Sequence, residues 1–346
     1  MLNGMRHTDT FMRYLSKMSI ALAGIAALLS LAAASLLYGN SSVDTSTLFS
    51  AFFDKQNADQ TISMILYDIR LPRVLAAVVC GAGLSISGLL LQEALGNNLA
   101  SPSVMGVTNG AGLFVLISAI LFGNSVIAKS FMAFIGALLT ITVVFAISRY
   151  AGSAKSTLVL SGVAASALMS AGINLIVVMK PDTVYDKMAF QLGSLSNVHK
   201  DILAVSAVLI FVSIIITVIL SKGIELFPLG DDVAHELGMP VRRYRVIALF
   251  LSVLFAAASV SVCGLISFVG LIVPNLIRQI SRSSFADKLL LSAVWGSNLI
   301  LAGDLLAKNI MYPYELPVGM LISLLGAPFF IIMIAKKRMR GYAWSR

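Results

Sequence analysis

Long apolar runs, separated by short polar stretches, dominate the pattern of hydrophobic and polar positions in this chain. A helix needs roughly 20 apolar residues to cross about 30 Å of hydrocarbon, because its backbone groups must be hydrogen-bonded within the segment. Ten such runs occur, at approximately 18–38, 74–95, 101–122, 127–148, 157–179, 202–221, 246–263, 264–277, 289–308 and 317–335. The pattern therefore predicts an all-α membrane protein with about ten transmembrane helices.

The eighth run, 264–277, is shorter than the others and contains Gly264, Gly270 and Pro274. These residues predict a broken or partly re-entrant helix, which is tolerated in a membrane only where protein shields it or where it lines a water-filled cavity. The first run follows basic residues, as in a signal peptide, but lacks a small-x-small cleavage site, so we interpret it as an uncleaved first span.

Between two of the runs lies a charged segment that begins at Gly230 and ends near Pro240. We expect a short helix here: Asp231 can cap its start, and Gly238 supplies a stop signal. Val233, Ala234 and Leu237 fall on one face at helical spacing. A helix of under two turns has little stability alone, which predicts that it packs against a partner. The alternative is an ordinary solvated loop.

Composition and charge agree with the membrane interpretation and suggest an orientation. The chain is 58% hydrophobic and only 12% charged, with a mean hydropathy of +0.92, whereas about a quarter of the residues of a soluble domain are charged. Ten crossings place both termini on one side, and 17 of the 25 Lys and Arg residues fall on that side. The positive-inside rule then predicts cytoplasmic termini and a cytoplasmic charged segment. The net charge of +9 is thus explained by orientation, not by nucleic-acid binding.

Catalytic and metal-binding motifs are missing from the sequence. It contains no phosphate-binding GxxxxGK[ST], no HExxH and no GxSxG, and its three histidines lie outside the apolar runs. Cys80 and Cys263 lie inside predicted spans without metal-ligand spacing, which is typical of packing residues. We therefore expect neither an enzyme nor a resident metal or cofactor.

Ionisable and polar side chains inside the apolar runs are the remaining candidates for function, because they are costly in hydrocarbon. Glu93 lies near the end of the second run, and Asp304 precedes Lys308 by four residues, which predicts an ion pair on one helix face. The second run also contains small residues at the spacing that allows close helix packing: Gly81, Gly83, Ser85, Ser87 and Gly88.

A polar bend follows that run and offers a candidate translocation pathway. Gln92 lies one turn beyond the small residues, and Asn97 and Asn98 follow it. These three side chains either border a hydrated cavity or pack inside the protein.

Several motifs, in order along nearly the whole chain, together resemble one family, the permease of iron-siderophore, haem and cobalamin ABC importers, a type II importer transmembrane protein. The motifs are Arg70-Leu71-Pro72-Arg73, Asn97-x-Leu99-Ala100-x-Pro102, Gly106-x-x-x-Gly110-Ala111, Gln191-Leu192-Gly193-Ser194-Leu195, Leu229-Gly230-Asp231-Asp232-x-Ala234-x-x-Leu237-Gly238, Gly264-x-Ile266-x-Phe268-x-Gly270-Leu271-x-x-Pro274, Gly303-Asp304, Glu315-Leu316-Pro317-Val318-Gly319 and Gly326-Ala327-Pro328-Phe329-Phe330. Two positions depart from the family pattern: Asn98 stands where proline is common, and Asn275 where histidine is common.

The resemblance implies a single permease domain over 1–346, with a cytoplasmic coupling loop at about 222–245. It implies that two copies, or a copy and a related permease, form a cavity at their interface in the bacterial cytoplasmic membrane. Two cytoplasmic ATP-binding subunits would contact the coupling helix, and the residues implied in this contact are Gly230, Asp231, Asp232, Ala234, His235, Glu236, Leu237 and Gly238.

On the outer side, Arg70 and Lys308 correspond to basic residues that meet acidic residues of a substrate-binding protein in relatives. Such exposed charges steer docking more than they add affinity. The implied function is ATP-driven import of an iron-siderophore by alternating access. A cobalamin or haem importer is the alternative within the family, and an ion-coupled carrier is an alternative outside it.

Overall fold

Helices form the framework of the protein in a computed structural model that describes residues 2–38, 60–103, 105–123, 125–150, 155–281, 283–311 and 314–343. No strand occurs within these ranges. The longer helices are α1 (Leu2–Leu37), α4 (Leu71–Leu95), α5 (Val107–Phe122), α6 (Val126–Tyr150), α7 (Lys155–Met179), α9 (Lys200–Ile219), α12 (Val241–Cys263), α13 (Val269–Ile280), α14 (Phe285–Asn309) and α15 (Val318–Ala343). Short helices join them: α3 (Gln60–Met64), the π-helix η1 (Ile65–Arg70), the 3-10 helix η2 (Pro181–Thr183), α8 (Val184–Leu192), α10 (Ser221–Ile224), the 3-10 helix η3 (Phe227–Leu229) and α11 (Asp231–Glu236).

The predicted fold class is confirmed. Within the described residues, seven helical segments are long and apolar enough to cross a membrane, and the second of them joins α3, η1 and α4 into one span, Gln60–Leu95. Three shorter apolar helices, α5, α13 and the apolar part of α15, account for the other predicted runs. Each of the ten runs found in the sequence thus corresponds to an apolar helix, although several boundaries differ by a few residues.

The predicted interruption of the eighth run is also confirmed. Residues 264–268 are not helical, and α13 starts only at Val269 after Phe268, whose φ is 67°. Neighbouring elements satisfy the backbone of this break: Leu265 N donates to Phe190 O at 2.9 Å, and Ser194 N donates to Cys263 O at 3.0 Å. The irregular segment is therefore shielded by protein, as a break inside a membrane requires.

Helix α4 lies at the centre of the bundle, in contact with α12, α13 and α14. Its small residues permit this packing: a Cβ atom on Gly88 would lie 1.9 Å from the carbonyl oxygen of Gly270, and one on Gly81 would lie 2.5 Å from that of Gly296. The predicted close helix packing is confirmed. Cys80 and Cys263 meet in the same region, where both thiols donate to Ser259 O, at 3.6 Å and 3.1 Å.

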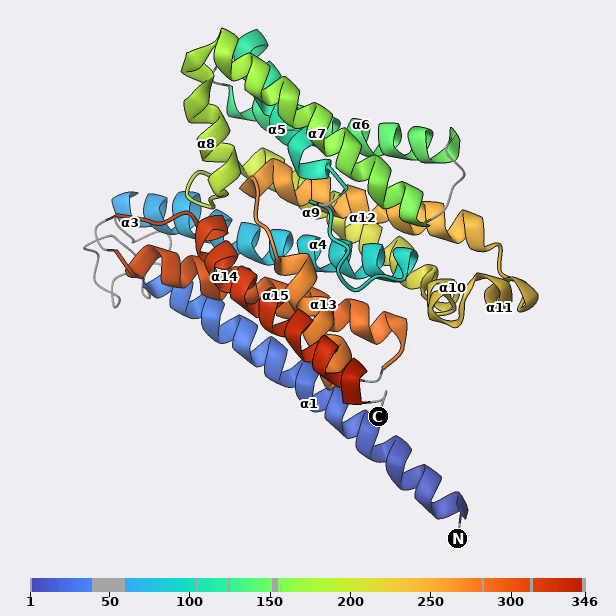
Figure 1. Cartoon of the computed structure of the whole chain (residues 1–346). Helices are drawn as coiled ribbons and strands as arrows, with labels where there is room; N and C mark the ends of the chain where they lie inside the picture. Colours follow the sequence, from blue (N-terminus) through green and yellow to red (C-terminus); the bar gives the residue numbers. More distant parts are fainter. Residues whose placement is uncertain are drawn as a thin grey trace.

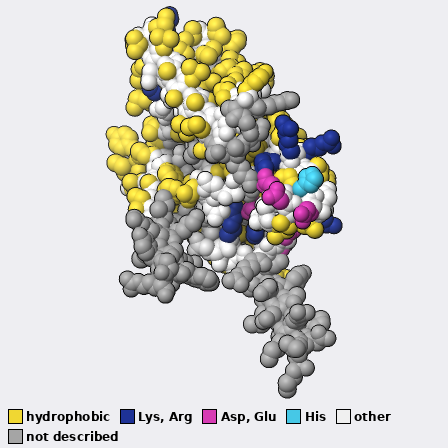
Figure 2. All heavy atoms as spheres, turned by 45° about the vertical axis from the view of Figure 1, so that its right-hand side comes forward, with side chains coloured by type: hydrophobic (Ala, Val, Ile, Leu, Met, Phe, Trp, Pro, Cys, Tyr) yellow, Lys and Arg dark blue, Asp and Glu magenta, His cyan; other side chains and the backbone are white. Residues whose placement is uncertain are grey.

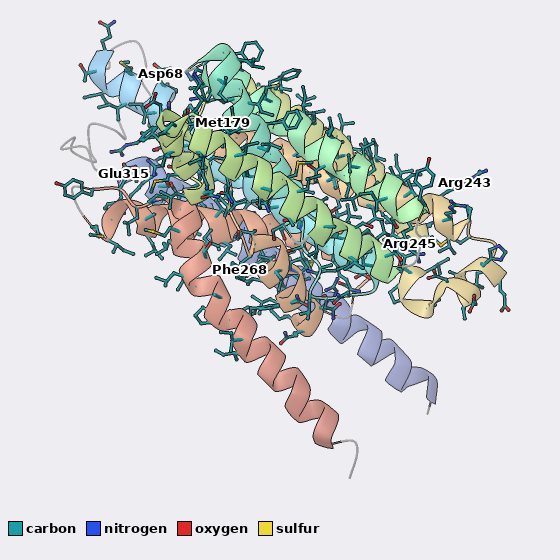
Figure 3. All side chains as sticks on the ribbon, turned by 45° about the horizontal axis from the view of Figure 1, so that its top comes forward. Asp68, Met179, Arg243, Arg245, Phe268 and Glu315 are labelled. Carbon is teal, nitrogen blue, oxygen red and sulfur yellow. The ribbon has the colours of Figure 1, made fainter. Side chains whose placement is uncertain are left out.

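The bundle has two distinct ends (Figure 1). Both chain termini, α10 and α11 lie at one end, which we call the α11 end; α3 and α8 lie at the other, which we call the α3 end. Figure 3 shows the same division at the level of side chains, with Arg243 and Arg245 at the α11 end and Asp68 and Glu315 at the α3 end. The expected placement of both termini and the charged segment on one side agrees with this arrangement.

Candidate functional site

The segment 230–238 projects from the α11 end on a short path between α9 and α12. Its six-residue helix α11 begins directly after Gly230 and is followed by Gly238, and these glycines have φ values of 96° and 82°. Such positive φ values favour glycine, because other residues clash with their own backbone there. The predicted stop at Gly238 is confirmed, since Gly238 N donates to His235 O at 2.9 Å and the helix does not continue.

Asp231 anchors α11 to the membrane helices and is not its cap residue. The residue at the cap position is Gly230 and Asp231 is the first residue of the helix, so the predicted cap position is wrong by one residue. The carboxylate of Asp231 accepts two hydrogen bonds from Arg245 of α12, at 2.8 Å and 2.6 Å. A bidentate pair of this kind fixes orientation as well as distance.

Arg245 extends this anchor to a third element. Its Nε donates to Ala94 O in the last turn of α4 at 3.0 Å, and its guanidinium lies 5.5 Å from the centre of the Phe227 ring of η3. One side chain therefore connects α11, α12, η3 and the central helix α4. A displacement of α11 would be transmitted to both membrane helices.

An apolar pair stays uncovered on the outer face of α11. Val233 and Leu237 are 46% and 62% exposed, whereas Ala234 is buried and packs inward, away from the face on which we expected it. Of the residues implied for ATPase coupling, the exposed ones are Asp232, His235, Glu236, Leu237 and Gly238. Figure 2 shows this end from the front, with acidic, histidine and apolar side chains together on the surface beside basic ones. This face is suited to form an interface with a folded partner protein.

A buried ionic cluster lies at the α3 end. Asp304 of α14, whose side chain is 1% exposed, accepts hydrogen bonds from Arg73 at 3.0 Å and 3.1 Å and pairs with Lys308 at 3.0 Å. Arg73 also pairs with Glu315 at 2.7 Å, and Lys308 donates to Ser35 Oγ at 3.1 Å. The predicted pair of Asp304 and Lys308 is confirmed, but it belongs to a larger set of two acids and two bases that we call the ionic cluster.

The two basic residues implied for docking are not exposed. Arg70 is 6% and Lys308 3% exposed, and Arg70 donates to the backbone carbonyls of Leu36 and Leu37. Our expectation of an exposed charge pairing at these two positions is therefore wrong for this conformation, because their charges are already satisfied within the protein. Whether they contact a binding protein stays a prediction.

Gln92 takes part in a polar junction between α4 and α13. Its side chain is 1% exposed, donates to Gly270 O at 2.9 Å and accepts a hydrogen bond from Arg278. Arg278 pairs also with Glu93 at 3.1 Å. Gln92 is thus packed between helices of this chain, and its role on a translocation pathway stays a prediction.

The polar bend after α4 lies partly at the surface. Asn97 and Asn98 are exposed, and Asn98 O accepts a hydrogen bond from Asn275 Nδ2 at 3.0 Å. The structure therefore brings the two positions that depart from the family pattern into contact.

Among the residues described here, no group of three or more His, Cys, Asp or Glu side chains gathers as metal ligands would.

Sequence reasoning missed Arg73 and Arg278 as partners of the intramembrane acids. Both are buried or half-buried arginines that reach acids 231 and 185 residues away in the sequence. The available signal was chemical: an acid in hydrocarbon demands a cation, and each arginine lies near the end of an apolar run.

Comparison with known proteins gives consistent matches over most of the chain. The sequence model of the FecCD transport family matches residues 26–336. The hemin transport system permease protein HmuU of Yersinia pestis is 36% identical over 280 residues, which cover 79% of this chain and 84% of that protein. The Fe(3+)-citrate import system permease protein YfmE of Bacillus subtilis is 34% identical over 277 residues, covering 80% and 83%. A metal-chelate type ABC transporter solved in an inward-facing conformation superimposes with a TM-score of 0.79 at 27% identity, covering 92% of this chain and 99% of that chain. The resemblance predicted from the motifs is confirmed.

Proposed function

Because the chain belongs to the FecCD transport family, we propose that it is the membrane permease subunit of an ATP-driven importer that carries an iron chelate, a siderophore or haem, across the bacterial cytoplasmic membrane. The names of its relatives support this class of cargo, since they include a hemin permease and an Fe(3+)-citrate permease. In this proposal, 1–346 act as one permease domain that hydrolyses no ATP itself. Two ATP-binding subunits in the cytoplasm supply the energy.

The observation that carries the proposal is the construction of the 230–238 segment. Its inner face is fixed to α12 and α4 through Asp231 and Arg245, while its outer face exposes Val233 and Leu237. An exposed apolar pair on an anchored helix is costly in water unless a partner covers it. We infer that the groove of an ATP-binding subunit covers this face.

Transport then follows from the rigid connection. Closure of the ATP-binding subunits displaces α11, and Arg245 transmits the displacement to α12 and to the end of α4. Two permeases, identical or related, change together the side of the membrane to which their shared cavity opens. ATP must bind one arrangement more tightly than the other, because a ligand that binds both equally shifts no equilibrium.

Cargo arrives at the α3 end from a substrate-binding protein. We propose that Lys308 contributes to this contact as a member of the ionic cluster, and that Arg70 contributes by holding the end of α1 through its hydrogen bonds to Leu36 O and Leu37 O. Gln92 would act on the pathway through the α4–α13 junction, and Asn97 and Asn98 through the exposed bend. Each role is a prediction about transport kinetics and not about chemistry.

Disruption of the exposed face tests the proposal. Val233→Asp combined with Leu237→Asp should reduce the amount of co-purified ATP-binding subunit by at least about tenfold, since exposed apolar anchors dominate such contacts. Binding-protein-dependent uptake into vesicles supplied with ATP should fall in parallel. The matched control is Ile310→Asp, which also places an acid on an exposed apolar position, at the end of α14 near the α3 end.

The control should keep co-purification of the ATP-binding subunit, because Ile310 lies at the other end of the bundle. Unchanged co-purification and uptake in the double variant, with its thermal unfolding unchanged, would remove the coupling role of this segment. Uptake that proceeds without any ATP-binding subunit would remove the importer assignment itself.

A further inference from the structure

An open groove of about 540 Å³ lies between α4 and α9 at the α3 end, outside every site described above. Its lining combines a charged mouth with apolar walls. The residues that line it are Tyr67, Asp68, Leu71, Pro72, Leu75, Val79, Lys200, Leu203, Ala204 and Ala207. Its size falls in the range of about 300–1,000 Å³ that is typical of small-molecule sites.

Each wall of the groove is one face of a helical segment. On α9, Lys200, Leu203, Ala204 and Ala207 follow the i, i+3, i+4, i+7 spacing of a single face. On the other wall, Asp68, Leu71, Leu75 and Val79 repeat every three or four residues from η1 into α4. Both walls therefore run along the bundle from a polar end into an apolar interior.

Small residues on α9 set the width of the groove, and a close contact between α4 and α9 sets its length. Ala204 and Ala207 fill little of the space between the helices, whereas farther along the two helices nearly touch: a Cβ atom on Gly83 would lie 2.9 Å from Ile210 Cδ1. The groove is thus open at the α3 end and closed toward the centre of the bundle.

Charges of both signs lie at the mouth. The ammonium of Lys200 pairs with the carboxylate of Asp68, and the two side chains are 55% and 52% exposed. An exposed pair of this kind contributes little to stability and is easily opened by a better partner. Asp68 belongs to the six-residue π-helix η1, a rare element that occurs frequently at functional sites. Figure 3 shows Asp68 at the end of the bundle opposite Arg245.

We propose that this groove binds one phospholipid with a zwitterionic, amine-bearing headgroup, phosphatidylethanolamine. One acyl chain lies between Leu75, Val79 and Ala207. The phosphate binds Lys200, and the headgroup ammonium binds Asp68, so the internal ion pair is exchanged for two pairs with the lipid. The charges match in sign, and the groove lies on helices that span the membrane, where lipid is the surrounding solvent.

The headgroup contact distinguishes this site from non-specific contact with the surrounding lipid. A tyrosine, Tyr67, lies at the mouth with the charged pair, where an amphipathic ring suits the headgroup level of a bilayer. A lipid held only by its chains would use the apolar walls and ignore both charges. The test therefore varies headgroup and groove separately.

Native mass spectrometry of the purified permease, titrated with dioleoyl-phosphatidylethanolamine, dioleoyl-phosphatidylglycerol or dioleoylglycerol, measures the first bound lipid. We expect the first phosphatidylethanolamine to bind at least about tenfold more tightly than dioleoylglycerol, as two charge-assisted contacts imply. Lys200→Gln should weaken both phospholipids, because both carry the phosphate. Asp68→Asn should weaken phosphatidylethanolamine alone.

A steric variant tests the groove itself. Ala204→Trp should abolish the tight site by filling the space between the helices. Val205→Trp is the matched control, since Val205 lies on the same helix, 62% exposed, off the face that lines the groove. The control should retain the site.

Three outcomes would overturn the proposal. Equal binding of dioleoylglycerol and phosphatidylethanolamine would show that the charges play no part. A change of oligomeric state in Ala204→Trp, with lipid binding unchanged, would assign the groove to a second copy of the chain. A loss of binding-protein capture in Ala204→Trp, with lipid binding unchanged, would assign the groove to the substrate-binding protein.

Discussion

At the scale of single residues, the ionic cluster shows how a membrane helix retains charge. Asp304, Lys308 and Arg73 are almost fully buried, and Glu315 is one-third exposed. Removing charges from water is costly, and their attraction offsets that cost only when geometry and additional hydrogen bonds are good. Here two acids balance two bases, and Asp304 bonds to both cations, so the cluster is stable only when it is complete.

Replacing Asp304 by asparagine should therefore destabilise the protein strongly. The variant leaves Lys308 without its carboxylate and Arg73 with Glu315 alone, and breaking a buried pair in this way costs about 3–5 kcal/mol. Thermal unfolding of the purified permease in detergent measures the loss. The control, Asp182→Asn, removes an exposed acid at the same end and should change stability by less than about 0.5 kcal/mol.

A second variant tests whether the loss of stability comes from the uncompensated charge of Lys308. Combining Asp304→Asn with Lys308→Met removes the uncompensated ammonium and should recover part of the lost stability. A single variant as stable as the wild type, or a double variant less stable than the single one, would contradict the account.

The residue-scale predictions from sequence succeeded where partners are local. Asp304 and Lys308 share one helix face, so their pairing could be predicted from spacing. Arg73 reaches Asp304 only because α4 packs against α14, and no local pattern encodes that contact. The same limit applies to Gln92, whose environment depends on the approach of α13. Its burial could not be derived from its place in the last turn of a span, just before a polar bend.

At the scale of elements, α11 has two different faces, and this difference supports its proposed coupling role. One face is bonded through Asp231 to Arg245, and the other presents Val233 and Leu237. The sequence predicted the helix, its length and its stop, because glycines and apolar spacing are local signals. It did not predict that Asp231 bonds to α12, since capping and salt bridging use the same carboxylate.

Arg245→Met should uncouple α11 from the membrane helices without detaching the ATP-binding subunit. The exposed face is unchanged, so the ATP-binding subunit should still co-purify. The loss of the bidentate pair and of the contact with Ala94 O should lower ATP-driven uptake by about tenfold, if the anchor supplies a coupling free energy of about 1–2 kcal/mol. Arg243→Met is the control, because Arg243 is exposed on the same helix. Loss of co-purification in Arg245→Met would show that Arg245 shapes the docking face instead.

The contact of α4 with α13 makes a separate prediction about packing. Gly88→Ala should destabilise the bundle by about 1–3 kcal/mol or more, because the new methyl group meets the backbone of Gly270, which has no flexible side chain to move. Gly112→Ala is the matched control within α5: its new methyl group would meet only side-chain atoms, the Phe190 ring at 3.3 Å and Ile173 Cδ1 at 3.5 Å. Alanine is the better helix former, so this control should be neutral or stabilising. Equal thermal unfolding of the two variants would contradict the assigned contact.

Element boundaries show which part of the fold the sequence encodes locally. The apolar runs located ten helices, because hydrocarbon imposes length and composition directly. The helix α13 starts at Val269 and not at 264, since Leu265 N donates a tertiary hydrogen bond to Phe190 O and the preceding backbone is held outside the helix. The π-helix η1 carries no sequence signature that we recognised, and together with α3 it extends the second span back to Gln60.

At the scale of the whole molecule, several separate observations agree with one orientation of the bundle in the membrane. The termini and α11 lie at one end of the bundle, and the ionic cluster and the lipid groove lie near the other (Figures 1 and 3). Basic residues are concentrated on the side of the termini, which favours that side as cytoplasmic. An ATP-binding partner at α11 and a binding protein at the α3 end both require this one orientation.

Site-specific labelling checks the orientation directly. Cys80 and Cys263 are both buried, at 0% and 1% exposure, so a membrane-impermeant maleimide should react only with an introduced cysteine. Leu237→Cys lies on the exposed face of α11, and Met311→Cys lies beyond α14 with 53% of Met311 exposed. In right-side-out vesicles that hold the permease without its ATP-binding subunits, Met311→Cys should react and Leu237→Cys should not, and inside-out vesicles should reverse the result. Labelling of Leu237→Cys from the outside would place the coupling face away from cytoplasmic ATP, and no importer of this design could then work.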